Sequence, residues 1–172
     1  MTFICLFFMA TLAIRLGTVA LSKRHEQTLK AQGAIEYDPR TSQILALAHF
    51  TFYGSGFAEA LLSPVEVDAL SIFGIALWLA SMGVLWSIIR TLGPLWTVKI
   101  IIAPHHELKQ TGFFSFVRHP NYFLNIIPEL IGYACALHCW YTVCFGLPLY
   151  MLILAKRIRV EEQIMRNAFP AY

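Results

Sequence analysis

Five apolar stretches, separated by short polar segments, dominate the chain. They cover residues 2–21, 43–63, 68–89, about 120–139 and about 142–156. The hydrocarbon core of a bilayer needs about 20 apolar residues in an α-helix, and the first four stretches reach that length. The fifth is shorter and follows the fourth almost at once, so these two are expected to form a tight helical hairpin. The pattern predicts an all-α integral membrane protein with five transmembrane helices.

Local signals mark the ends of these segments. Pro64 lies in the turn before the third stretch, and Asp68 can cap the helix that follows. Pro120 stands at a first-turn position of the fourth stretch. The first stretch has no clear small-residue cleavage site before the basic residues at 23–24, so it is expected to remain as a span.

The composition agrees with this picture. Hydrophobic residues make up 58% of the chain and charged residues only 13%, whereas soluble domains average about 45–50% and about 25%. The 172 residues allow one compact bundle. We therefore expect a single membrane domain over residues 1–172, with an N-terminal three-helix part at 1–93 and a functional part at 94–172.

The basic residues predict an orientation. Twelve of the thirteen Lys and Arg residues follow the first, third or fifth stretch, which puts them on one side if all five stretches cross the bilayer. The opposite side holds Glu66 and Asp68 and no Lys or Arg. Because Lys and Arg concentrate in cytoplasmic loops, the N-terminus is expected outside and the C-terminus in the cytoplasm.

Arg15, His49, Glu59 and Glu129 are ionisable residues well inside the apolar stretches. Such groups are costly inside a bilayer and usually face a cavity or a partner. Arg15 lies in the inner half of the first stretch, where its side chain is expected to extend to the cytoplasmic interface. The other three are read either as neutral or paired structural residues or as groups that face a functional cavity.

Titratable residues gather at the cytoplasmic ends of the last two stretches, where the hairpin would bring them together. The segment Arg-His-Pro-Asn-Tyr at 118–122 opens the fourth stretch, and Arg-Ile-Arg-Val-Glu-Glu at 157–162 follows the fifth. Arg157 and Glu161 are four residues apart, and Arg159 and Glu162 three apart, so each pair shares one helix face. The alternative is that these cations serve only the topology and form ordinary surface ion pairs.

These two segments resemble a known family. The stretch HHELKQTGFFSFVRHPNYFLN at 105–125, followed by RIRVEEQIM at 157–165, is similar to the isoprenylcysteine carboxyl methyltransferase family. The N-terminal part looks more like the small bacterial members, some of which are associated with synthesis of alkylresorcinols or alkylpyrones. The resemblance implies S-adenosylmethionine as methyl donor, a lipophilic or prenylated acceptor reached through the bilayer, and a bacterial inner-membrane location with the active site at the cytoplasmic face.

The resemblance also implies which residues contact the cofactor. Position by position, these contacts fall on His106, Glu107, Leu108, Lys109, Phe114, His119, Pro120, Asn121, Tyr122 and Glu161, with Lys99 as a further contact. An arginine one turn before the glutamate, here Arg157, would face the acceptor. The choice between Glu161 and Glu162 stays open.

The chemistry of a sulfonium zwitterion fits these residue types. Arg118 or His119 can hold its carboxylate, Glu161 its ammonium or ribose hydroxyls, and aromatic rings its sulfonium. Methyl transfer depends on alignment of the acceptor oxygen. A carboxylate acceptor needs only orientation, for which Arg157 is suited, whereas a phenol must lose a proton, with His119 and Glu162 as candidate bases.

Two other function classes remain open at this stage. One is a non-enzymatic membrane scaffold, and the other is a lipid reductase of similar helical build that uses NADPH. Cys135 and Cys139 are four residues apart, but no second ligand pair lies nearby in the sequence, so no metal site is expected. Nothing in the pattern indicates a nucleic-acid partner, and the oligomeric state is not predicted.

Overall fold

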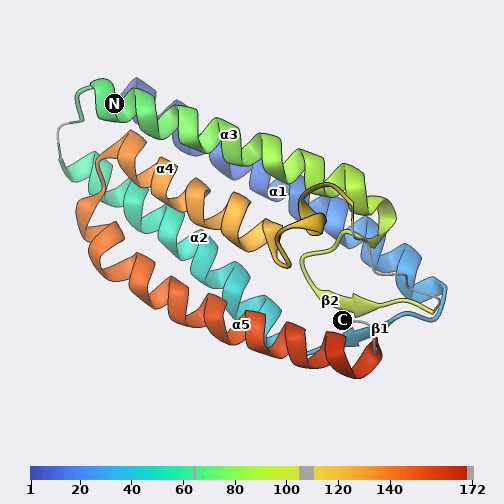
Figure 1. Cartoon of the computed structure of the whole chain (residues 1–172). Coiled ribbons are helices and arrows are strands. Elements are labelled where there is room, and N and C mark those ends of the chain that lie inside the picture. The colour runs from blue at the N-terminus through green and yellow to red at the C-terminus, as the bar shows by residue number, and fades with distance from the viewer. Residues whose placement is uncertain (64, 105–110, 170–172) are drawn as a thin grey trace.

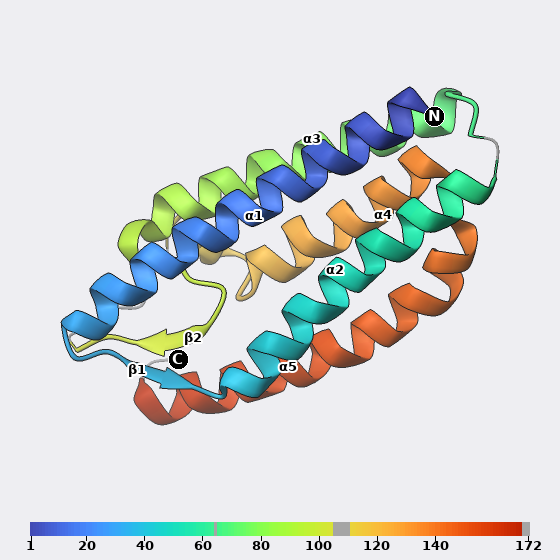
Figure 2. The same ribbon diagram turned by 180° about the vertical axis from the view of Figure 1, so that it is seen from behind.

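The computed structural model of the chain describes residues 1–63, 65–104 and 111–169, and these form a mostly helical, elongated bundle (Figures 1 and 2). The five α-helices are α1 (Thr2–Ala31), α2 (Pro39–Leu62), α3 (Ala69–Leu92), α4 (Ile127–Leu137) and α5 (Leu147–Ala168). The prediction of five helices is therefore confirmed. Two segments, Thr2–Ala31 and Ala69–Leu95, are long and apolar enough to cross a bilayer by length and composition.

The polar linkers contain more regular structure than the sequence pattern predicted. The polar segment after the first apolar stretch is not a loop throughout, because α1 continues to Ala31 and is followed by β1 (Ile35–Tyr37). This strand pairs in antiparallel fashion with β2 (Ile100–Ile102), with Tyr37 opposite Ile100. The small sheet lies at the same end of the bundle as the end of α5 (Figure 1).

Paired charges join the sheet to α1. Lys99, just before β2, places its Nζ 2.7 Å from Glu26 on α1 and 3.0 Å from Glu36 on β1. Lys30 contacts the same two carboxylates at 2.5 Å. Alternating charges of this kind cancel locally, so the linkers fold back on the bundle instead of extending into solvent.

Helix starts follow the expected capping rules. The Asp68 carboxylate accepts a hydrogen bond from the Ser71 backbone N–H at 2.9 Å, which confirms the predicted cap of α3. Asp38 caps α2 in the same way through Thr41, with Pro39 in the first turn. Wide π-helical turns precede α4 and α5, at Asn121–Ile126 and Thr142–Gly146. Pro128 and Pro148 follow them, and proline cannot donate the i→i−4 hydrogen bond of a regular helix.

Helices α3 and α4 approach closely because glycines face each other. A Cβ on Gly74 would lie 2.3 Å from the backbone nitrogen of Ala136, and one on Gly132 would lie 2.7 Å from that of Trp78. The two backbones therefore touch without intervening side chains. This contact fixes the position of α4, whose preceding turn carries His119 and Tyr122.

Helices α4 and α5 are joined by a short turn in which His138 adopts a left-handed conformation, with φ 53°. The hairpin itself is more open than expected, because α2 packs against both helices (Figure 2). Glu59 of α2 closes the turn by accepting hydrogen bonds from the backbone N–H groups of Tyr141 and Thr142, each at 2.8 Å. Glu59 is thus a paired structural residue.

The expectation that Arg15 extends to the interface is wrong. Its Nε donates to Glu129 at 2.6 Å, and its Nη2 forms an ion pair with the same carboxylate. Glu129 is fully buried, and the hydroxyl of Tyr53 also donates to it. The ion pair with Glu129 on α4 holds the Arg15 side chain inside the bundle instead of letting it extend toward water. Sequence spacing alone does not reveal this partner.

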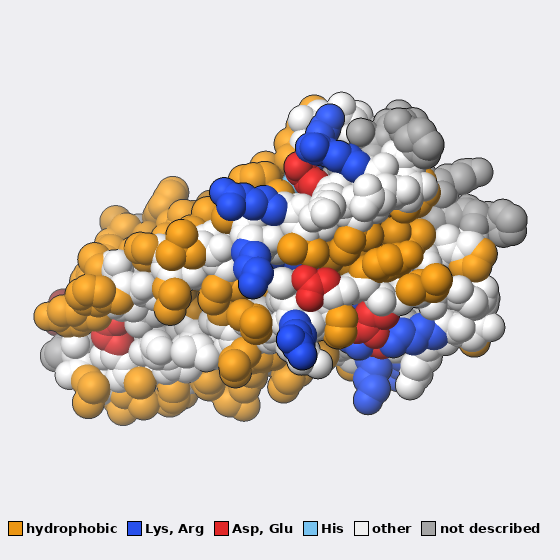
Figure 3. All heavy atoms as spheres, turned by 90° about the horizontal axis from the view of Figure 1, so that it is seen from below, with side chains coloured by type: hydrophobic (Ala, Val, Ile, Leu, Met, Phe, Trp, Pro, Cys, Tyr) orange, Lys and Arg blue, Asp and Glu red, His pale blue; other side chains and the backbone are white. Residues whose placement is uncertain are grey.

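Exposed apolar side chains and basic side chains gather on different parts of the surface. Large apolar side chains such as Leu47, Phe145 and Leu152 are more than two-thirds exposed. On the face shown in Figure 3, hydrophobic side chains cover one end, and the Lys and Arg side chains gather toward the other.

Candidate active site

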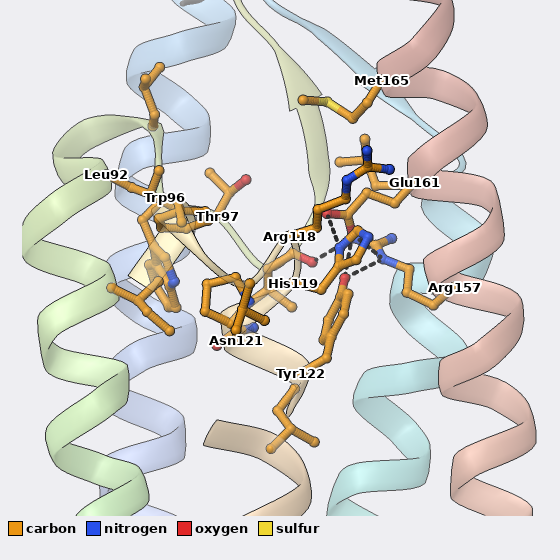
Figure 4. A pocket seen from close by; sticks show the side chains of 18 of the residues that line it. Leu92, Trp96, Thr97, Arg118, His119, Asn121, Tyr122, Arg157, Glu161 and Met165 are labelled. Carbon is orange, nitrogen blue, oxygen red and sulfur yellow. Dashed lines mark hydrogen bonds and ion pairs between the residues drawn. The ribbon is translucent and has the colours of Figure 1, made fainter. Parts of the chain in front are cut away.

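A cavity of about 670 Å³ lies between the bundle and the β1–β2 sheet. Its walls come from α1, α2, α3, β2, the turn before α4 and the C-terminal half of α5, so segments distant in sequence meet there (Figure 4). Ligand pockets commonly have volumes of about 300–1,000 Å³. The lining is mixed, because apolar residues such as Leu45, Ile88 and Ile126 share the cavity with titratable groups.

Tyr122 and Glu161 hold the two ends of the hairpin together across this cavity. The Tyr122 hydroxyl donates to the Glu161 carboxylate at 2.5 Å, and the His119 Nδ1 lies 3.5 Å from the same carboxylate (Figure 4). His119 and Tyr122 are 5% and 6% exposed. The predicted meeting of the two segments is therefore confirmed in space.

Arg157 is enclosed by protein groups on three sides. Its Nε donates to the Tyr122 hydroxyl at 3.1 Å, its Nη1 to the Ser42 hydroxyl at 2.6 Å and its Nη2 to the Val98 carbonyl at 3.0 Å. The Glu161 carboxylate lies 3.7 Å from Nε, in the predicted i,i+4 pairing. Arg157 thus connects α5 to α2, to the segment before β2 and to the turn before α4.

Mutual pairing shifts the pKa values of His119 and Glu161. Burial lowers the pKa of His119, but hydrogen bonds and negative charge from Glu161 and Glu162 outweigh it and leave the pKa above its ordinary value. Burial raises the pKa of Glu161, but the His119 hydrogen bond, the Arg157 charge and the Tyr122 hydroxyl together lower it. Each group therefore favours the charged form of the other.

Most of the sequence-predicted residues line this cavity. They are Lys99, Phe114, Arg118, His119, Pro120, Asn121, Tyr122, Arg157 and Glu161. Glu162 is not among the described residues that line it. Its carboxylate lies 3.3 Å from His119 Nε2 and 3.1 Å from Arg166, whereas Arg159 is exposed. His106, Glu107, Leu108 and Lys109 fall outside the described residues.

Several lining residues were not predicted from the sequence. Arg15 comes from α1, Trp96 and Thr97 precede β2, and Met165 lies one turn beyond Glu161 on α5. Met165 could have been found from its i,i+4 spacing to Glu161. Arg15 could not, because no local signal shows which face of α1 meets the cavity.

Comparison with known proteins shows the family to which the residues of this site belong. Residues 74–167, which include every titratable group at the ends of α4 and α5, match the model of the isoprenylcysteine carboxyl methyltransferase (ICMT) family. The chain belongs to this family. The match makes it a relative of membrane methyltransferases, which generally use S-adenosylmethionine.

Two full-length relatives support the family membership. An "Uncharacterized protein" of Haemophilus influenzae is 44% identical over 170 residues, which cover 99% of each chain. The "Uncharacterized protein YpbQ" of Bacillus subtilis is 29% identical over 155 residues, 89% of this chain and 90% of that one. No solved structure matches the chain.

The residue types that line the cavity fit S-adenosylmethionine, the methyl donor that the family generally uses. Arg118 and His119 supply cations for a carboxylate, Glu161 supplies an anion for an ammonium or hydroxyls, and Phe114 and Trp96 supply rings. The described residues contain no group of three or more His, Cys, Asp or Glu residues that could hold a metal.

Proposed function

We propose that the chain is an S-adenosylmethionine-dependent O-methyltransferase for a lipophilic acceptor dissolved in the membrane. The observation that carries the proposal is the contact of Tyr122 and His119 with Glu161 in the lining of a large cavity. Family membership supports the reaction class. The apolar residues in the same lining support a lipophilic acceptor.

The cofactor would lie at the polar side of the cavity. Arg118 and His119 would hold its carboxylate, Glu161 its ammonium or ribose, and Phe114, Pro120, Asn121 and Tyr122 would surround it, with Lys99 near the rim. When bound, S-adenosylmethionine supplies an electrophilic methyl group on a sulfonium. The residues His106, Glu107, Leu108 and Lys109 belong to the same proposed contact set by resemblance.

The acceptor oxygen would meet the methyl group near Arg157. This arginine has five N–H donors, and its three nitrogens already bond to Tyr122, Ser42 and Val98. It is therefore fixed in position, and its remaining N–H groups are available to orient an oxygen. Positioning of this kind supplies much of the rate in a one-step transfer.

Proton handling depends on the acceptor. A carboxylate acceptor is already a nucleophile. For a hydroxyl acceptor, neutral His119 would take the hydroxyl proton on a ring nitrogen, and its raised pKa favours holding that proton. The Glu162 carboxylate, 3.3 Å from His119 Nε2, would stabilise the imidazolium that forms.

The membrane position follows from the surface and the charge pattern. We infer that all five helices cross the bilayer, with the exposed apolar side chains facing lipid and the basic end facing the cytoplasm. The cavity would then open at the inner interface of a bacterial inner membrane. A water-soluble cofactor and a lipid-soluble acceptor could each reach it from its own phase.

Titration calorimetry on the detergent-purified chain separates the function classes. We expect S-adenosylhomocysteine to bind and NADPH not to bind. Binding of NADPH alone would indicate a reductase instead of a methyltransferase. Binding of neither ligand would favour a scaffold. N-acetyl-S-farnesylcysteine, a carboxylate, and pentadecylresorcinol, a phenol, then serve as acceptor probes for the two classes of oxygen.

A further inference from the structure

Arg15 reaches the cavity from α1, a helix to which the mechanism above assigns no group. It lines the same cavity as apolar residues such as Leu45, Ile88 and Ile126, and its side chain is 12% exposed. A guanidinium in such surroundings loses most of its hydration and must recover that free energy from partners. The identity of these partners therefore shows what the side chain is held for.

Glu129 holds one edge of the Arg15 guanidinium. Nε donates to its carboxylate at 2.6 Å, and Nη2 pairs with the second oxygen. Glu129 is itself fixed by the Tyr53 hydroxyl and lies 3.6 Å from His49 Nε2, and His49 Nδ1 is 3.1 Å from the Tyr150 hydroxyl. This network fixes Glu129 and, through it, the orientation of the Arg15 guanidinium.

Glu129 holds Arg15 along one edge of the guanidinium. The hydrogen bond and the ion pair between the two residues use Nε and Nη2 of Arg15. Arg157 differs, because each of its three nitrogens donates to a protein group. Of these two arginines in the cavity wall, Arg15 is therefore the better placed to accept a ligand at its second edge.

Charge balance alone does not account for this arrangement. The ion pair neutralises Arg15 and ties α1 to α4, a role that an apolar pair of similar volume would fill equally well. An arginine is favoured over an apolar residue where a planar fork must bind oxygen atoms. Arg15 lines the same cavity as several apolar residues. Its position therefore suits the polar head of a lipophilic molecule.

We propose that Arg15 binds an oxygen of the acceptor's head group, with Glu129 as its positioning residue. This inference rests on the proposed methyltransferase function and extends its acceptor site. The acceptor would be held at two points, near Arg157 at the reacting oxygen and at Arg15 by a second oxygen. It follows that the acceptor class carries at least two oxygen atoms in its head group, as a carboxylate or a dihydroxylated ring does.

The test is a titration of folded variants with acceptor and cofactor probes. The double variant Arg15→Met/Glu129→Gln removes both charges together, so neither remains buried alone, and Arg15→Lys keeps the charge but loses the fork. Glu59→Gln is the matched control, because it removes another intramembrane carboxylate at the far end of the bundle. Each protein is titrated with N-acetyl-S-farnesylcysteine, pentadecylresorcinol and S-adenosylhomocysteine, and its melting temperature is recorded.

We expect the double variant to bind the acceptor probe about tenfold more weakly or worse, as loss of a charged hydrogen bond requires. Its affinity for S-adenosylhomocysteine should stay within about threefold of wild type. Arg15→Lys should recover part of the acceptor affinity, and Glu59→Gln should match wild type. A folded double variant with wild-type acceptor affinity would overturn the inference, as would a wild-type chain that binds S-adenosylhomocysteine but neither acceptor probe. Failure of wild type to bind S-adenosylhomocysteine would count against the methyltransferase itself.

Discussion

Glu161 is the residue on which most of the site's contacts converge. It accepts a hydrogen bond from Tyr122, lies within ion-pair distance of His119 and Arg157, and faces the cavity. Glu162, one residue further along, contacts His119 and Arg166 instead. We therefore propose Glu161 as the cofactor ligand, a choice that the sequence motif left open.

Replacement of each glutamate by glutamine tests this assignment. Glu161→Gln should weaken S-adenosylhomocysteine binding by about tenfold or more, because a charged hydrogen bond is lost in a partly buried site. Glu162→Gln should leave this affinity within about threefold of wild type. Calorimetry measures both, and equal losses in the two variants would show that Glu161 has no special role.

His119 makes the stability of the site depend on pH. Its folded pKa is raised above the unfolded value of about 6.5, so its stabilising contribution is complete below that pH and is lost as the pH rises through the folded pKa. The melting temperature of wild type should therefore exceed that of His119→Gln most at about pH 6 and least at about pH 9. A gap that widens with rising pH would contradict the pairing with Glu161 and Glu162.

The sequence motif predicted the residues at the polar side of the cavity but not those opposite. Tyr122, His119 and Glu161 could be predicted because a short segment at each end of one hairpin carries them, and the chain must bring those ends together. Arg15 was assigned to the interface because a long side chain in the inner half of a span can reach water. Glu129, its partner, lies 114 residues away, and only the packing of α1 on the bundle brings the two into contact.

At the scale of elements, the glycine contact between α3 and α4 determines where the site can form. A methyl group at residue 74 would overlap the backbone of Ala136, which cannot move away as a side chain could. Gly83, on the same helix, has no heavy atom within 4 Å of the position its Cβ would occupy. These two glycines provide a matched pair of substitution sites.

We expect Gly74→Ala to lower the melting temperature of the purified protein and to weaken S-adenosylhomocysteine binding, because displacement of α4 moves His119 and Tyr122. The destabilisation should be about 1–3 kcal/mol, as is typical of overpacking. Gly83→Ala should be neutral or slightly stabilising, since alanine favours helix. If both variants melt at the wild-type temperature, the close approach of the two backbones does not hold in solution.

The short strands were the elements that the apolar pattern could not predict. Ile100–Ile102 is a continuous apolar run of three residues, too short to distinguish a strand from a loop lying on the membrane. Its partner, Ile35–Tyr37, follows a helix that the hydropathy pattern ended ten residues too early, at 21 rather than 31. The polar last turns of α1 are held by Lys30 and Lys99 pairing with Glu26 and Glu36, which are contacts between segments and not a local preference.

At the scale of the whole molecule, the bundle has one basic end with the cavity and one end almost without basic residues. Helix number and charge pattern together predict that the cavity end faces the cytoplasm. Single cysteines in a background without the four native ones test this. Glu66→Cys should react with a membrane-impermeant maleimide in intact cells, and Gln32→Cys should react only after permeabilisation. The reverse pattern would place the cavity on the wrong side for a cytosolic cofactor.

We propose that this cavity moves a methyl group onto a lipid. The reaction itself can be measured as the transfer of tritiated methyl from S-adenosylmethionine into organic-extractable material by membranes that contain the chain. We expect labelled lipid with wild type and a return to the level of chain-free membranes with Glu161→Gln at equal protein abundance. Labelling that is unchanged by Glu161→Gln, or absent with wild type when acceptor probes are supplied, would contradict it.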